Sequence, residues 1–313
     1  MRILITGGTG SLGHALVDHY LKNTDHRLIV LSRDELKQAQ MREEFPDGRL
    51  DFFLGDVRDL QRLELAFEAH IDVVLHAAAL KRIDSVCNDP DEVFKTNILG
   101  SRNVLHAARG RVKKCLLIST DKACYPINAY GLSKAMGEHL FIANNVYGKP
   151  KDSASSVVRY GNVMGSRGSV IERWRLQKAN GEPLKITHPE MTRFLITLPQ
   201  AVQMIETALT AMTGGETFVP RLTAVKMEAL ASAIAGPSYP QETVGLRPGG
   251  EKMHETLMTD EETERAMEYG PDPHFAIIYP DMGGTRGGGI GKYGWRSDRA
   301  PQVENLAKLL ETL

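Results

Sequence analysis

The sequence has few cysteines and no long apolar run. Its three cysteines, Cys87, Cys115 and Cys124, share no C-x-x-C spacing. An odd, scattered set of cysteines is not typical of a disulfide framework or a structural zinc site, and it favours a reducing compartment. No stretch approaches the roughly 18–20 apolar residues of a membrane-spanning helix. These features predict a cytoplasmic protein that is not inserted in a membrane.

The sequence also has no large excess of charge of either sign. The chain carries 38 Lys and Arg against 39 Asp and Glu, a formal net charge of -1. Such a balance does not favour nucleic acid or an anionic membrane as a partner. Only three apolar residues separate Met1-Arg2 from Thr6, so we expect no signal peptide. His188 and His254 have no partner in the sequence that suggests a metal site, and none is expected.

Short apolar runs alternate with helical patterns over the first half of the chain. Strands are expected at 3–5, 28–31, 50–54, 73–75, 115–118 and 156–159, and helices at 11–21, 36–44, 60–69, 93–108 and 130–145. This alternation predicts an α/β fold, a Rossmann-type, doubly wound parallel sheet with helices on both faces. Such a sheet binds ligands beyond the carboxyl ends of its strands.

The rhythm changes after about residue 164, where Pro and Gly become frequent. We expect residues 1–164 to form a dinucleotide-binding domain and residues 165–313 to form a smaller part that mainly binds substrate. Helices are expected near 198–212, which we expect to pack back on the sheet, and at 227–235 and 302–313. The glycine-rich segment 283–291 is interpreted as a flexible loop.

Residues 7–13 read GGTGSLG, between a strand and a helix. Glycine permits a tight turn and a close approach of the backbone to a pyrophosphate at the helix N-terminus. The spacing in this context predicts dinucleotide binding. The candidate residues of this loop are Gly7, Thr9, Gly10, Ser11, Leu12 and Gly13.

The end of the second strand indicates which dinucleotide is bound. Enzymes that read the ribose 2′-hydroxyl of NAD usually carry an acid here, whereas this chain has Ser32 and Arg33. A hydroxyl and a guanidinium suit a 2′-phosphate, so NADP is favoured over NAD. Asp34, beside Arg33, leaves open that Arg33 is a solvated surface charge. Further cofactor candidates are Asp56, Val57, Ala77, Ala78, Ala79, Lys81 and Asn97.

Tyr130 and Lys134 form a Tyr-x-x-x-Lys pair on one face of a predicted helix. A lysine cation lowers the pKa of a nearby tyrosine, which then acts as a base toward a sugar hydroxyl and lies beside the cofactor. Thr120, at the end of the fifth strand, is placed to hydrogen-bond the same oxygen. Together with the glycine loop, these residues resemble the extended short-chain dehydrogenase/reductase family over roughly residues 2–165.

A closer resemblance rests on the run Ser119-Thr120-Asp121-Lys122-Ala123. Glucose-type sugar-nucleotide dehydratases have Thr-Asp-Glu here, whereas this run is similar to that of the inverting UDP-N-acetylglucosamine 4,6-dehydratases. Segments 32–35, 55–59, 77–81, 159–163, 165–169 and 191–194 support the resemblance. The family's Arg-Pro-Gly-Glu-Lys-x-His-Glu run appears at 247–255 with one extra glycine.

The resemblance implies a hydro-lyase with an internal redox cycle. Tyr130 would deprotonate the carbon-4 hydroxyl while hydride passes to NADP, and hydride would later return to carbon 6. Lys122, if neutral, would remove the carbon-5 proton, and Asp121, if protonated, would protonate the leaving hydroxyl. This scheme needs a dry site in which the pKa of the lysine is lowered and that of the aspartate is raised.

The resemblance also implies a UDP-sugar site, with UDP-N-acetylglucosamine as the expected substrate. Arg193 and Arg247 are the expected diphosphate ligands, because a guanidinium matches phosphate oxygens. The other expected substrate ligands are Lys81, Asn162, Gly168, Ser169 and Glu251. A homo-oligomer is expected through the helices at 93–108 and 130–145. Two alternatives stay open: a UDP-sugar 4-epimerase or retaining dehydratase, and a nucleotide-binding regulator without catalysis.

Overall fold

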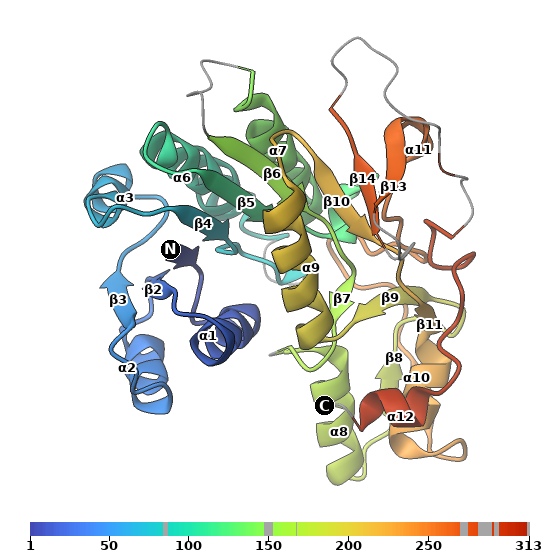
Figure 1. Ribbon diagram of the computed structural model, residues 1–313. Helices are drawn as coiled ribbons and strands as arrows, with labels where there is room; N and C mark the ends of the chain where they lie inside the picture. The colour runs from blue at the N-terminus through green and yellow to red at the C-terminus, as the bar shows by residue number, and fades with distance from the viewer. Residues whose placement is uncertain are drawn as a thin grey trace.

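The computed structural model describes residues 1–83, 87–146, 153–166, 168–269, 275–280, 290 and 294–311. Its main sheet has nine strands in the order β13-β14-β10-β6-β5-β4-β1-β2-β3 (Figure 1). These strands are β1 (Arg2–Thr6), β2 (Arg27–Ser32), β3 (Leu50–Leu54), β4 (Val73–His76), β5 (Lys114–Ile118), β6 (Ala154–Val158), β10 (Thr217–Pro220), β13 (Ala266–Tyr269) and β14 (Phe275–Ile278). The order β3-β2-β1-β4-β5-β6 is parallel throughout, which confirms the doubly wound fold.

Helices cover both faces of the sheet because each buried strand is apolar on both sides. Ile3 and Ile5 pack in the same core cluster as side chains of α1 (Ser11–Asn23), α2 (Glu35–Glu44) and α9 (Leu198–Ala211). On the other face, Leu4 packs with α3 (Leu60–Phe67), α6 (Gly100–Ala108) and α7 (Ala129–Ala143).

The helix expected at 93–108 is divided in the structure. A short helix α5 (Pro90–Val93) leads into a π-helical segment η1 (Phe94–Leu99), and α6 follows at Gly100. A π turn inserts a residue into the helical repeat, which no apolar periodicity announces. In η1 the buried Asn97 bonds with both backbone groups of Leu80, over 2.8 and 2.9 Å, and so holds the loop after β4.

The second half of the chain returns to the main sheet. β10 pairs in parallel with β6, and β14 and β13 follow in antiparallel pairing. Helix α9 also lies against α1, where the Tyr20 hydroxyl bonds the Glu206 carboxylate. The large sheet therefore contains strands from both sides of residue 164.

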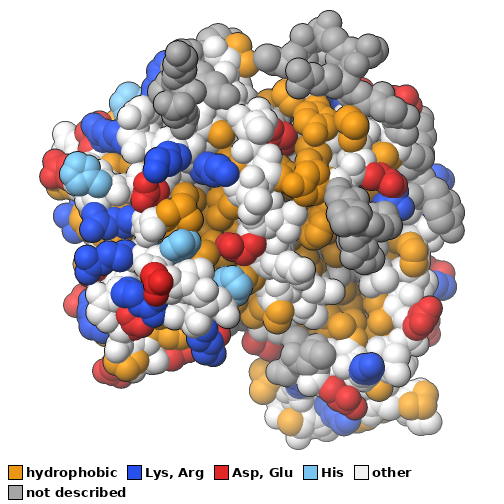
Figure 2. All heavy atoms as spheres, in the orientation of Figure 1, with side chains coloured by type: hydrophobic (Ala, Val, Ile, Leu, Met, Phe, Trp, Pro, Cys, Tyr) orange, Lys and Arg blue, Asp and Glu red, His pale blue; other side chains and the backbone are white. Residues whose placement is uncertain are grey.

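The remaining elements lie at one side of the sheet, toward α8 and α12 in Figure 1. They comprise β7 (Asn162–Val163), α8 (Val170–Ala179), β8 (Leu184–Ile186), β9 (Thr192–Ile196), β11 (Ala224–Lys226), α10 (Met227–Ala235), β12 (Gln241–Thr243) and α12 (Leu306–Leu310). Helix α11 (Asp260–Arg265) lies instead beside β13 and β14 (Figure 1). The last helix is shorter than expected, because Asn305 caps it through the Lys308 N–H over 2.9 Å. The surface is notched between this side and the side of α1 and α2 (Figure 2).

No helix among the described residues has both the length and the apolar character that a bilayer crossing requires.

Close backbone packing at the start of α1 is directly testable. A Cβ on Gly13 would lie 2.0 Å from the Gly8 carbonyl oxygen, whereas one on Gly48 would meet nothing within 4 Å. We expect Gly13→Ala to lower the free energy of unfolding by about 3 kcal/mol, the upper end of overpacking effects, because backbone cannot rotate away. Gly48→Ala is the matched control in urea unfolding. Equal stability of the two variants would contradict the packing described.

Candidate active site

The turn between β1 and α1 forms a cradle with room for a phosphate. Gly7 has φ +70°, and a Cβ there would lie 2.8 Å from the backbone of Ala78. Gly10 precedes α1, and no side chain caps the helix. The N-terminus of this 13-residue helix thus has no side-chain cap at Gly10, and a helix N-terminus of this kind favours an anion. This geometry fits a dinucleotide pyrophosphate beside Gly7, Gly10 and Ala78.

At the end of the second strand, Ser32 and Arg33 have different environments. Ser32 is buried, and its hydroxyl accepts a hydrogen bond from Gln38 Nε2 over 3.1 Å. The Arg33 side chain is 54% exposed and lies 3.8 Å from Asp56 Oδ2. Because Arg58 holds the same oxygen more closely, at 2.7 Å, the Arg33 guanidinium remains available to an anion.

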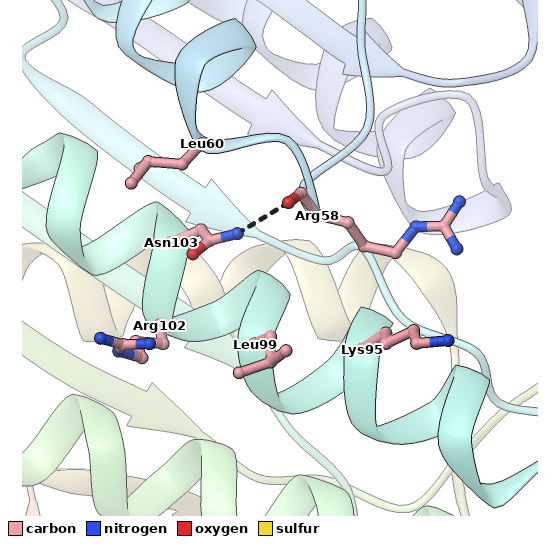
Figure 3. A pocket seen from close by; sticks show the side chains of 6 residues that line it. All are labelled: Arg58, Leu60, Lys95, Leu99, Arg102 and Asn103. Atoms are coloured by element: carbon pink, nitrogen blue, oxygen red, sulfur yellow. Dashed lines mark hydrogen bonds between the residues drawn. The ribbon is translucent and has the colours of Figure 1, made fainter.

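The backbone at the end of β3 is fixed from α6. Asn103 donates to the carbonyl oxygens of Val57 and Arg58, over 3.1 and 3.0 Å (Figure 3). Arg58 and Asn103 border a surface pocket of about 380 Å³ that is also lined by Lys95 and Arg102. None of the predicted catalytic residues lines this pocket.

The catalytic pair of α7 is buried against the end of β5. Lys134 Nζ donates to the Ile118 carbonyl oxygen over 2.6 Å, and burial lowers the pKa of Lys134 to about 8 although Glu138 opposes this. Burial raises the pKa of Tyr130 to about 12, against the Lys122 charge and a hydrogen bond with Thr120. Lys122 is a cation that opposes the effect of burial on the pKa of Tyr130.

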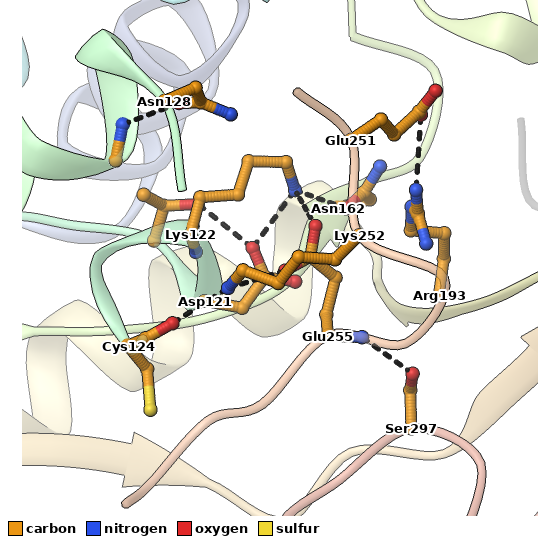
Figure 4. A network of polar contacts seen from close by, with 12 residues as sticks. Asp121, Lys122, Cys124, Asn128, Asn162, Arg193, Glu251, Lys252, Glu255 and Ser297 are labelled. Atoms are coloured by element: carbon orange, nitrogen blue, oxygen red, sulfur yellow. Dashed lines mark hydrogen bonds and ion pairs between the residues drawn. The ribbon is translucent and has the colours of Figure 1, made fainter. Parts of the chain in front are cut away.

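Lys122 lies at the centre of a network of polar contacts (Figure 4). Its Nζ is 3.0 Å from Asp121 Oδ1, 3.3 Å from Glu255 Oε1 and 3.2 Å from Asn162 Oδ1. Burial would lower its pKa, but the two carboxylates outweigh burial and raise it. The expected lowering of the Lys122 pKa is therefore wrong for this arrangement, because Glu255 supplies a second anion.

Asp121 has the raised pKa that its expected role requires. The residue is fully buried, and burial, together with the negative charge of Glu255, raises its pKa against Lys122 and Thr120. Thr120 Oγ1 donates to Oδ1 over 2.9 Å, whereas Oδ2 has no hydrogen-bond partner in the structure. Oδ2 is therefore the oxygen on which a proton fits.

Glu255 and Lys252 belong to this site, although sequence reasoning gave them no role. Glu255 Oε2 is 3.1 Å from Lys252 Nζ, which also donates to the Cys124 carbonyl oxygen over 2.6 Å. Burial would raise the pKa of Glu255, but the cations Lys122, Arg193 and Lys252 lower it to about 2. The only sequence signal was their presence in the run at 247–255.

The structure brings Arg193, Arg247 and Glu251 together. Glu251 Oε1 accepts from Arg193 over 3.0 Å and from Arg247 over 2.6 Å. Two guanidiniums share one carboxylate, so the group keeps a net positive charge, which suits a diphosphate. The extra glycine is accommodated because Gly249 and Gly250 both have φ +93°. The Gly250 carbonyl oxygen accepts from Asn128 Nδ2 over 2.8 Å, which ties this loop to the start of α7.

The remaining candidates are more dispersed. Asn162 joins the network through Lys122, whereas Ser169 caps α8, and the Gly168 N–H bonds Glu172 at the same helix end. The Asn97 amide is fully engaged with Leu80 and Ser133, so it positions a loop instead of facing the notch. Most of the segment 283–291 lies outside the described residues. Over the described parts of the chain, no group of three or more His, Cys, Asp or Glu residues is arranged to hold a metal ion.

Comparison with known proteins places this geometry in a family. The family described as "Polysaccharide biosynthesis protein" matches residues 3–275. The chain belongs to this family. The matched range includes the glycine loop at residues 7–13 and the network around Lys122, so the family match covers the whole candidate site.

Relatives with two different activities match this chain at nearly the same sequence identity. An inverting UDP-N-acetylglucosamine 4,6-dehydratase of Campylobacter jejuni is 41% identical over 278 residues, which are 88% of this chain and 82% of that protein. A UDP-glucose 4-epimerase of Rickettsia prowazekii is 42% identical, over 86% of this chain and 80% of its own length. The resemblance inferred from the motifs is confirmed.

Solved structures confirm the fold. Pen from Bacillus thuringiensis has a TM-score of 0.91 and 33% identity, covering 100% of this chain and 98% of its own. The dTDP-glucose 4,6-dehydratase DesIV of Streptomyces venezuelae has a TM-score of 0.71 over 80% of this chain and 86% of its own. At 22% identity, DesIV supports the fold alone.

Proposed function

We propose that this protein is a UDP-N-acetylglucosamine 4,6-dehydratase that inverts carbon 5. The observation that carries the proposal is the buried contact of Lys122 with Asp121 beside Tyr130. A 4-epimerase needs a base at the carbon-4 hydroxyl, but a dehydratase also needs an acid for the leaving hydroxyl and a base at carbon 5. Asp121 and Lys122 supply those two additional groups. The Campylobacter relative supports the same conclusion.

The residues divide the chemistry among them. A bound nicotinamide supplies the hydride acceptor and donor. Tyr130, hydrogen-bonded with Thr120, takes the proton of the carbon-4 hydroxyl, and Lys134 shares its helix face. The resulting carbon-4 ketone acidifies the proton at carbon 5. Lys122 is assigned as the base that removes it, and it must first give up the proton that Asp121 and Glu255 stabilise on its amine. Asp121 gives the proton of Oδ2 to the hydroxyl that leaves carbon 6. Because these groups are buried, water is kept from the intermediate.

The diphosphate and the cofactor are assigned to the two basic ends of the site. Arg193 and Arg247 hold the UDP diphosphate, with Glu251 fixing both guanidiniums. Arg33 faces the 2′-phosphate of NADP, which we propose as the cofactor in preference to NAD. The Thermus thermophilus UDP-glucose 4-epimerase, 26% identical, is solved with NAD, so a nicotinamide cofactor itself has support from a relative.

We also propose a homo-oligomer. Leu132 and Met136 lie one turn apart on α7 and are about half exposed, and Phe94 of the adjoining η1 is similarly exposed. Apolar side chains grouped on one helical surface favour a protein interface.

A 4-epimerase is the second candidate, because the Rickettsia relative is 42% identical and the Campylobacter relative 41%. The two candidates separate when purified protein is incubated with UDP-N-acetylglucosamine in deuterated water without added reductant. We expect proton NMR to show a new carbon-6 methyl signal, deuterium at carbon 5 and an L-configured ring. Isomerisation to the galacto sugar without a methyl signal would establish the epimerase instead. Bound cofactor without turnover of any UDP-sugar would favour the regulator.

The choice of NADP is tested separately by binding. We expect Arg33→Ala to weaken NADP about ten- to hundredfold, the effect of losing a charge-assisted hydrogen bond, and to leave NAD affinity unchanged. Arg27→Ala, at the exposed start of the same strand, is the matched control in calorimetric titration. An equal loss for NAD and NADP, or no loss for NADP, would contradict the assignment.

A further inference from the structure

Glu255 is buried beside the proposed acid and base and is fixed in place. Its backbone N–H donates to Ser297 Oγ over 3.0 Å, and the Ser297 N–H returns a bond to the Glu255 carbonyl oxygen over 2.9 Å. Ser297 is in turn bonded to Thr192 Oγ1 over 2.6 Å, at the start of β9. The Glu255 side chain is only 2% exposed, and its carboxylate lies 3.3 Å from Lys122 Nζ. The backbone hydrogen bonds to Ser297 hold it in this position.

Two carboxyl groups contact the single ammonium of Lys122. Buried carboxylates this close to one another do not both ionise readily, so one holds the proton. Glu255 has the better claim to the negative charge, because Lys252 contacts its other oxygen and Arg193 adds a further cation. Asp121 has a free oxygen and contacts no second cation in the structure described.

We propose that Glu255 is a positioning residue that serves as the counter-ion of Lys122 and thereby keeps the proton on Asp121. The inference rests on the proposed function and deepens it. Without Glu255, Asp121 is the only carboxylate left on Lys122 and ionises to balance it. An ionised Asp121 cannot protonate the hydroxyl that leaves carbon 6. In this proposal Glu255 acts through its contact with Lys122.

Removing the charge of Glu255 should shift the pH profile of activity in a predictable direction. The groups that face Glu255 are Lys122 and Asp121 from η2 (Asp121–Ala123), Tyr130 from α7, Arg193 from β9 and Lys252 from its own loop. Loss of its negative charge lowers the pKa of Asp121, Lys122 and Tyr130. Activity is lost at high pH when Asp121 deprotonates, so this limb of the profile moves to lower pH in a variant that lacks the charge of Glu255.

The first variant is Glu255→Gln, measured with UDP-N-acetylglucosamine by release of the 4-keto-6-deoxy product across pH 5–9. We expect kcat at neutral pH to fall about ten- to hundredfold, consistent with loss of an acid catalyst, and KM to change less than about twofold. The high-pH limb should shift down by about one pH unit. Glu255→Asp keeps the charge and should retain the wild-type limb.

Lys252→Met supplies a second test with the opposite sign. Removing this cation raises the pKa values of the cluster, so the high-pH limb should move to higher pH. This variant keeps the proposal falsifiable if Glu255→Gln does not fold. The charge control is Glu268→Gln on β13, which removes an exposed carboxylate that pairs with Arg221. This variant should match wild type.

The outcomes separate the inference from the proposed function. Wild-type protein that produces no methyl signal overturns the proposed function and the inference with it. Wild-type activity together with an unshifted high-pH limb in Glu255→Gln and Lys252→Met overturns the inference alone. A rise in KM at constant kcat in Glu255→Gln also overturns it, because that result assigns Glu255 to substrate binding.

Discussion

The contact between a buried ammonium and two carboxyl groups is the constraint on which the site depends. Lys122 lies 3.0 Å from Asp121 and 3.3 Å from Glu255, in a position where burial opposes every charge. Such a cluster is stable only when its charges and protons balance. Lys122 and Lys252 are the cations that contact Glu255, and Asp121 is the carboxyl whose pKa burial and the charge of Glu255 raise.

The architecture brings these groups together from distant parts of the chain. Asp121 and Lys122 follow β5, whereas Glu255 comes from the loop after β12 and is held against β9 through Ser297 and Thr192. A second buried network locks the catalytic helix to the same region. Arg159, at the end of β6, bonds Glu138 of α7 at 2.6 Å and Glu262 of α11 at 2.8 Å. The Tyr130 helix and the substrate side are therefore held as one unit.

Sequence patterns predicted the sheet because its strands are buried on both faces and alternate regularly with helices. The glycine cradle, Tyr130 and Lys134 were predicted for a related reason, since their chemistry requires fixed short spacings. The π-helical segment at Phe94–Leu99 could not be predicted, because it changes the helical repeat and contains no proline or glycine of its own.

Glu255 shows a second limit of sequence reasoning. It lies more than 130 positions from Lys122, and only the folded chain shows that the two meet. The predicted lowering of the Lys122 pKa was wrong for the same reason, because the prediction included the charge of Asp121 and not that of Glu255. The pairing of Arg193 and Arg247 on Glu251 likewise depends on a loop that turns through Gly249 and Gly250.

The central claim is that Asp121 carries a proton at neutral pH while Glu255 is ionised. Infrared difference spectroscopy with carbon-13-labelled Asp measures this directly, because a protonated carboxyl absorbs well above a carboxylate. The account predicts a buried protonated-carboxyl band at pH 7 in the wild type that disappears in Asp121→Asn. Absence of that band in the wild type, or its persistence in Asp121→Asn, would contradict the account.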